Sequence, residues 1–223
     1  MAGAAGVLGA EVLRRLAGSG RFASTQVLAK EPMTTSAPQV SMVEVTGDLQ
    51  AWPAVPAQMG LVMFEPPRLY YDRERALFTP APDQLLALAQ WLRRCGVHTL
   101  AVVLPHAQGR LPDAVKRGLA NLDEQALAAL GFERLLLVRA AQKMPTAAAQ
   151  GFLNKTAAWM LSTLSYMIPA TEQPVRPSKL AEFIDLALPL LPPGTHVASP
   201  ELLWQSAEGK DTRLVVQAWL GGS

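Results

Sequence analysis

Hydrophobic and polar positions follow two alternating periods along the first 140 residues of the chain. Apolar residues recur every three to four positions over residues 6–16, with charged residues between them, and this pattern predicts an amphipathic helix. Short alternating or continuous apolar runs at residues 25–29, 40–45 and 60–64 predict strands. The run at 60–64 (GLVMF) is apolar throughout, as expected for a strand that is covered on both faces.

The same two periods continue toward the carboxyl end. The expected elements are helices at 85–92, 113–130 and 178–191, strands at 98–104 and 135–138, mostly helical chain at 147–167, and a late strand within 196–204. Alternation of buried strands with amphipathic helices predicts an α/β fold, a Rossmann-like doubly wound parallel sheet with a small carboxyl-terminal lobe. Residues 1–140 are expected to form the core, and residues 141–223 a helical segment that completes the same domain.

A glycine turn opens the chain. The first nine residues, MAGAAGVLG, contain a G-x-x-G-x-x-G run that leads directly into the first predicted helix. Glycines let backbone N–H groups approach a phosphate, and the helix N-terminus adds partial positive charge. Such a turn normally follows a buried strand, and here only two residues precede Gly3. We therefore expect either that the natural chain begins several residues upstream with an apolar strand, or that another segment fills the gap. The candidates for that segment are the apolar tail at 214–216 and a partner chain.

Composition narrows the function classes. Half of the 223 residues are hydrophobic, which is enough for a large core, and the net charge of +2 with scattered basic residues argues against a nucleic-acid partner. A single cysteine, Cys95, excludes an internal disulfide, and the three histidines are too dispersed for a metal site. The longest apolar run, 157–170, contains hydroxyl residues and is shorter than the ~20 residues that span a bilayer. These features predict a soluble cytoplasmic protein without a membrane partner.

The chain resembles the atypical short-chain dehydrogenases/reductases, the NAD(P)-binding Rossmann group that includes the NmrA-like and Tat-interacting-protein-like members. The resemblance spans roughly the whole chain in the order of its elements, and the glycine turn is its specific motif. The matching residues are Gly3, Gly6 and Gly9; Gly20-Arg21-Phe22 leading to Val27-Leu28; Asp48-Leu49; residues 136–140 (LLVRA); Val175-Arg176-Pro177; and Lys179-Leu180-Ala181.

The resemblance implies a dinucleotide, NADP or NAD, bound across the strand ends. The residues expected at its pyrophosphate are Gly3, Ala5, Gly6, Val7, Leu8 and Gly9. The residue after the second strand selects the cofactor, and that place holds Lys30, whose cation favours the 2′-phosphate of NADP(H). A solvated lysine beside Glu31 is the equally weighted alternative.

The catalytic pair of the family is absent. Its members use a Tyr-x-x-x-Lys pair in which the lysine lowers the tyrosine pKa. Lys116 stands at a plausible position for the lysine, but Pro112 replaces the tyrosine, and residues 104–109 after the strand contain no serine. His106 is a candidate substitute acid/base, although a loop histidine with an ordinary hydrogen bond is the more frequent case.

Two further segments have two interpretations each. Residues 70–75 (YYDRER), which open the charged, aromatic loop 70–82, are either a lid over the nucleotide or an exposed loop. The apolar residues Trp159, Met160, Leu164 and Met167 form either core or a substrate cleft or subunit contact, the last implying a homodimer.

Three functions remain open after the sequence analysis. The first is an NAD(P)-binding protein that lacks Tyr–Lys catalysis. The second is an active NADP-dependent oxidoreductase or epimerase acting on an unidentified small molecule, with His106 and Lys116 in its site. The third is a nucleotide-free scaffold or assembly factor.

Overall fold

Six strands and the helices between them make up the described structure, a computed structural model that covers residues 1–68, 70–106, 124–141, 175–208 and 211–222. The strands are β1 (Thr25–Ala29), β2 (Val40–Glu44), β3 (Met59–Val62), β4 (Thr99–His106), β5 (Arg134–Ala141) and β6 (Gly194–Ala198). The labelled helices are α1 (Gly6–Gly18), α2 (Asp72–Arg75), α3 (Leu85–Arg94), α6 (Pro177–Ala187), α7 (Pro200–Ala207) and α8 (Thr212–Gly221), and residues 124–129 are helical as well. Short 3-10 helices lie at Leu49–Ala51, Pro82–Gln84 and Leu188–Leu190.

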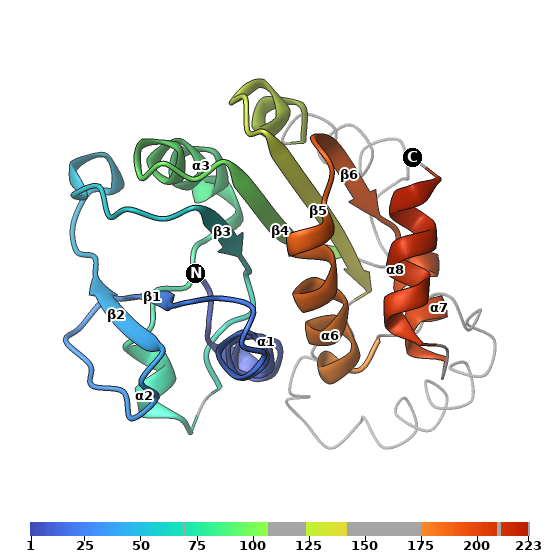
Figure 1. Cartoon of the computed structure of the whole chain (residues 1–223). Coiled ribbons are helices and arrows are strands. Elements are labelled where there is room, and N and C mark those ends of the chain that lie inside the picture. Colours follow the sequence, from blue (N-terminus) through green and yellow to red (C-terminus); the bar gives the residue numbers. More distant parts are fainter. Residues whose placement is uncertain (69, 107–123, 142–174, 209–210, 223) are drawn as a thin grey trace, which may run out of the picture.

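The six described strands pair in parallel, and they form a two-stranded sheet (β1-β2) and a four-stranded sheet (β3-β4-β5-β6). Residues 1–3 lie between the two sheets and join them (Figure 1). The N–H of Ala2 donates to the carbonyl of Leu61 at 2.9 Å, and the N–H of Leu28 donates to the carbonyl of Met1 at 3.0 Å. The strand order is therefore β2-β1-(1–3)-β3-β4-β5-β6, which is a doubly wound, Rossmann-like arrangement.

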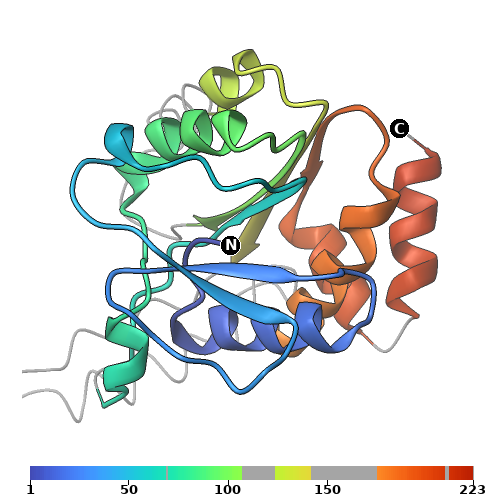
Figure 2. The same ribbon diagram turned by 60° about the vertical axis from the view of Figure 1, so that its left-hand side comes forward.

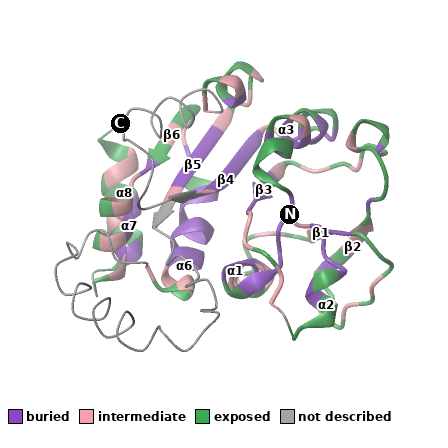
Figure 3. Ribbon diagram, turned by 180° about the vertical axis from the view of Figure 1, so that it is seen from behind, coloured by how far each residue is buried: buried purple, intermediate pink, exposed green. Residues whose placement is uncertain are grey.

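Helices cover both faces of this sheet (Figure 2). Alternate residues of β3, β4 and β5 point to opposite faces, as the period of a strand requires. One set packs with α1, α6, α7 and α8, and the other packs with α3. Among the residues that the structure describes, those of the central strands and of the inner side of α6 are largely buried (Figure 3).

The expected first strand exists only as the bridging residues 1–3. The apolar tail at 214–216 does not replace it, because these residues lie within α8 and Val216 packs in the core on the α6 side of the sheet. That alternative is therefore wrong: an amphipathic helix buries the tail's apolar face against α6 and leaves Leu214 exposed.

No helix among the described residues combines the length and the apolar character that crossing a bilayer requires.

Candidate functional site

The glycine turn lies at the point where the strand order reverses. Residues 1–3 are hydrogen-bonded to β1 on one side and to β3 on the other, so the carboxyl ends of these strands and the N-terminus of α1 lie at one edge of the sheet, which is where the ligand crevice of a parallel α/β sheet is expected. Parallel α/β sheets bind ligands at this point.

Each glycine of the turn is required by a close approach within the chain. Gly3 has a φ of +79° and Gly6 a φ of +76°, both in the left-handed region that side chains disfavour. A Cβ on Gly3 would collide with the carbonyl of Met63, and one on Gly6 would lie 2.6 Å from Oε2 of Glu65. A Cβ on Gly9 would lie 2.6 Å from the carbonyl oxygen of Gly3. The turn is thus folded tightly against β3 and against its own helix.

Two carboxylates accept hydrogen bonds from backbone N–H groups at the start of α1. The N–H of Gly6 donates to Oε2 of Glu74 at 3.0 Å, and the N–H of Leu8 donates to Oε2 of Glu65 at 2.6 Å. Glu65 follows β3, and Glu74 lies in α2. The methyl side chain of the N-cap residue Ala5 cannot accept a hydrogen bond from these donors, so the two carboxylates take that role and also complement the helix dipole.

Arg68 holds the second of these carboxylates in place. Its guanidinium forms an ion pair with Glu74, and its backbone N–H donates to Oε2 of Glu74 at 2.9 Å. Burial opposes ionisation of Glu74, but the bonds from Arg68 and from the N–H of Gly6 outweigh it and place the pKa of Glu74 below its ordinary value. The site therefore contains a buried anion with a cation beside it.

The segment that carries Glu74 continues along the end of β1 and is hydrogen-bonded to it. The N–H of Phe78 donates to the carbonyl of Leu28, and the N–H of Lys30 donates to the carbonyl of Ala76. Phe78 is buried and makes an edge-to-face contact with Trp52, whose ring centroid lies 5.0 Å away. Residues 76–78 thus lie beside the end of β1, where an adenosine would be expected.

The other residues expected at the cofactor differ in how far their side chains are exposed. Ala5 is fully buried in the turn, whereas Val7 is 49% exposed. The side chain of Lys30 is exposed at the end of β1, next to the crevice.

The candidate catalytic residues do not assemble into a described site. His106 ends β4, where its backbone lies beside Ala141 of β5 at the carboxyl edge of the sheet. Lys116 lies outside the described residues, as do Trp159, Met160, Leu164 and Met167.

Sequence reasoning missed Glu65 and the role of Glu74. Glu74 belongs to the segment considered as a lid, and it does reach the glycine turn. A usable signal was present: a helix whose first turn has no acidic residue and no capping side chain needs an anion from elsewhere.

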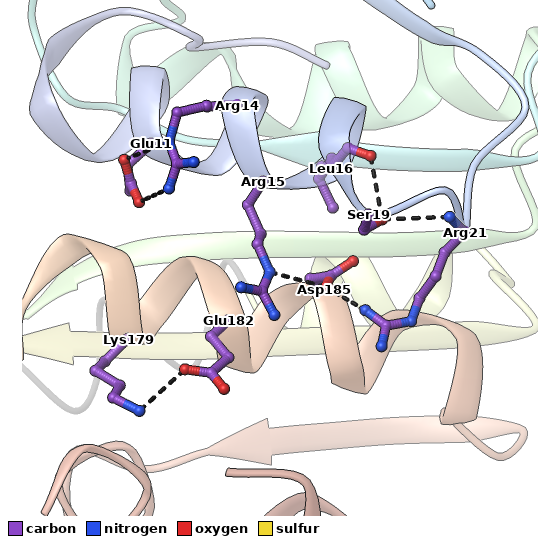
Figure 4. Close-up of polar contacts among 9 residues, drawn as sticks. All are labelled: Glu11, Arg14, Arg15, Leu16, Ser19, Arg21, Lys179, Glu182 and Asp185. Carbon is purple, nitrogen blue, oxygen red and sulfur yellow. Dashed lines mark hydrogen bonds and ion pairs between the residues drawn. The ribbon is translucent and has the colours of Figure 1, made fainter. Parts of the chain in front are cut away.

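A second polar cluster fixes the other end of α1 (Figure 4). Asp185 of α6 is fully buried, and its Oδ2 accepts hydrogen bonds from Arg15 at 3.1 Å and from Arg21. Oδ1 of the same carboxylate is buried without a hydrogen-bond partner. This cluster ties the helix that carries the glycine turn to the carboxyl-terminal helices.

No protein-family model and no curated relative matches the sequence. Among solved structures, the chain is similar to one described as MoeE5 in complex with UDP-glucuronic acid and NAD. The two share 15% of aligned residues over 98% of this chain and 90% of that one, with a TM-score of 0.42. A similarity at that level does not identify a ligand. The chemistry of a ligand is therefore inferred from the contacts of the glycine turn.

Proposed function

We propose that the chain binds NAD(P) at the glycine turn, and that the pyrophosphate takes the place of the carboxylates of Glu65 and Glu74. The observation that supports this proposal is that the N–H groups of Gly6 and Leu8 already hold anions, at 3.0 and 2.6 Å. A site that binds two carboxylates has the donors and the local positive potential that a pyrophosphate requires.

Arg68 makes the exchange of anions chemically reasonable. Its guanidinium is 37% exposed and is paired with Glu74 in the free protein. When a pyrophosphate displaces Glu74, the guanidinium of Arg68 loses its carboxylate partner. It then pairs with an oxygen of the phosphate that the N–H groups hold. Residues 76–78 then have to leave the end of β1, because an adenosine and Phe78 would compete for that space.

The proposed activity is binding without Tyr–Lys proton transfer, since Pro112 stands four residues before Lys116. His106 is the residue proposed for acid/base chemistry if turnover occurs, because β4 ends there at the same edge of the sheet. Lys30 is proposed to favour NADPH over NADH, since its side chain is exposed beside the crevice.

A calorimetric titration of NADH and NADPH into the protein tests this proposal. We expect micromolar binding, and Glu65→Gln should tighten it about tenfold, or about 1.4 kcal/mol, because the substitution removes a negative charge that competes with the phosphates. Glu65 is the better target because Glu74 also pairs with Arg68. Glu11→Gln is the matched control: this carboxylate lies on α1 but pairs with Arg14, so its loss should leave the affinity unchanged.

One observation favours a second function, a scaffold that has kept the fold and lost the nucleotide. The N–H groups at the start of α1 are bonded to the chain's own Glu65 and Glu74, and Phe78 is buried beside the end of β1. If neither cofactor binds to the folded wild type or to Glu65→Gln, the nucleotide proposal is wrong and the scaffold remains.

A further inference from the structure

A small pocket lies at the carboxyl-terminal end of α1, at the far end of this helix from the glycine turn. It has a volume of about 280 Å³, and its lining residues are Arg14, Arg15, Gly18, Ser19, Arg21 and Asp185. The 13 residues of α1 place it about 20 Å from the glycine turn. The pocket is therefore separate from the proposed nucleotide site.

Two arginines in this pocket share one oxygen of a carboxylate. Arg15 and Arg21 reach Asp185 from opposite sides (Figure 4), and each gives a single nitrogen to its Oδ2, Nε from Arg15 and Nη1 from Arg21. Among the described residues, the two terminal nitrogens of Arg15 and the Nε and Nη2 of Arg21 have no hydrogen-bond partner. Most of the donor capacity of the two guanidinium groups is thus unused.

Other arginines of the chain pair with carboxylates more completely. Arg14, Arg68 and Arg139 each donate through both Nε and Nη2 to a single carboxylate. Two parallel hydrogen bonds of this kind make the strongest arginine–carboxylate pairs. The single bonds of Arg15 and Arg21 therefore leave donors for a further acceptor in the pocket.

The charges around the pocket favour an anion as that acceptor. Asp185 is fully buried and neutralises one of the two cations that it holds, while Arg14 is paired with Glu11. One positive charge thus remains on Arg15 and Arg21 together, and about a third of each of these side chains is exposed. An anion from solvent can reach both guanidinium groups without displacing Asp185.

The arrangement of the two guanidinium groups also selects the shape of the anion. A planar carboxylate matches one guanidinium, as Glu124 does with Arg139. A phosphate has tetrahedral oxygens and can accept hydrogen bonds from two guanidinium groups that lie in different planes. The pocket is slightly smaller than the range of about 300–1,000 Å³ typical of drug-sized ligands, so it suits a phosphate group and not a whole nucleotide.

We propose that this pocket binds a phosphate group through Arg15 and Arg21. Asp185 is a positioning residue in this site, because it holds one nitrogen of each arginine and leaves the others free. The charge of Asp185 and the partial negative charge at the carboxyl end of α1 both oppose the anion. We therefore expect a dissociation constant of about 1 mM.

A titration of inorganic phosphate into ¹⁵N-labelled protein in low salt, followed through the Nε–H resonances of the arginines, tests this proposal. We expect the resonances of Arg15 and Arg21 to shift saturably. Arg21→Met should weaken binding about tenfold, and Asp185→Asn should tighten it about tenfold, because Asn removes the competing charge. Arg94→Met is the matched control: it removes an equal charge from an exposed site on α3 and should leave the affinity unchanged.

The proposal is overturned if neither the wild type nor Asp185→Asn shows saturable shifts, or if Arg94→Met weakens binding as much as Arg21→Met does. Acetate that binds as tightly as phosphate would contradict the selection of a tetrahedral anion. Tighter binding of glycerol 3-phosphate than of phosphate would assign the pocket to a phosphorylated small molecule, and equal binding would assign it to the free ion. These readouts come from arginines remote from the glycine turn, so they succeed or fail independently of the function proposed above.

Discussion

At the scale of single residues, close contacts within the chain already require the glycines of the turn, whether or not a ligand binds. Gly6 has a left-handed φ, and the space where its Cβ would stand is taken by the side chain of Glu65. Loss of cofactor binding on substitution of Gly6 would therefore not by itself locate a pyrophosphate. The cost of the left-handed backbone at Gly6 and the cost of the collision with Glu65 have to be measured separately.

Gly20 provides the comparison for this separation. It has a φ of +68° but nothing within 4 Å of its Cβ position, so Gly20→Ala should cost only the left-handed strain of about 1 kcal/mol. Gly6→Ala should cost more, about 2 kcal/mol, and in a Glu65→Ala background the added cost of Gly6→Ala should fall to that of Gly20→Ala. Urea denaturation of the wild type and of the four variants measures the free energies of unfolding. An unchanged cost of Gly6→Ala in the Glu65→Ala background would show that Glu65 is not its cause.

The ion pairs of Asp185 give a second test, in which two variants should lose stability to different extents. Replacing it by Asn leaves Arg15 and Arg21, which are 38% and 34% exposed and can reach water, so the expected loss is about 1 kcal/mol. Replacing both arginines by Met leaves a fully buried carboxylate without a cation, and the expected loss is about 3 kcal/mol. Chemical denaturation of the two variants checks the order, and a larger loss in Asp185→Asn would contradict it.

At the scale of elements, sequence periodicity predicted the strands of the described residues well, whereas the expected helix at 147–167 and residues 113–123 of the helix at 113–130 lie outside the described residues. The strand at 25–29 has the expected bounds, and those at β2, β3, β4 and β5 differ only at their ends. The late strand is Gly194–Ala198, earlier than expected, because Ser199 begins a new helix by accepting a hydrogen bond from the N–H of Leu202. The sequence did not predict that residues 76–78 pair with the end of β1, since that pairing depends on long-range contacts and not on a local period.

Phe78 tests whether this segment closes the crevice. Phe78→Ala removes a buried ring and its contact with Trp52, so we expect the free energy of unfolding to fall by about 3 kcal/mol. Its backbone bonds to Gly3 and Leu28 involve no side chain, and an added nucleotide should bind more tightly to the emptied space. Calorimetry with NADPH checks the affinity, and Phe132→Ala, on a partly buried ring elsewhere, is the control. Equal affinities in the two variants would argue that Phe78 does not block the site.

At the scale of the whole molecule, stability should respond to pH through two groups near the glycine turn. The pKa of Glu74 is lowered in the folded state, so its contribution is present above the unfolded pKa and is lost as the pH falls through the folded pKa. The amine of Met1 behaves differently. Its pKa falls from 8.0 to about 6, so between these values the unfolded chain binds a proton that the folded chain does not.

For protein with a free amine on Met1, the free energy of unfolding should therefore rise from pH 6 to pH 8, by about 2 kcal/mol. Denaturation in urea at pH 6, 7 and 8 measures this rise. A form acetylated on this amine has no titrating group there and should show no such rise. A flat profile in both forms would mean that the amine of Met1 stays solvated.

The two fixed ends of α1 make this helix a mechanical link across the protein. Its N-terminus carries the N–H groups that hold Glu65 and Glu74, and near its C-terminus Arg15 is bound to Asp185 of α6. Thirteen residues of rigid helix span about 20 Å, too stiff to bend in response to a shift at one end. Exchange of one anion for another at the glycine turn should thus be transmitted as a tilt to α6, so that the carboxyl-terminal helices report whether the crevice is occupied.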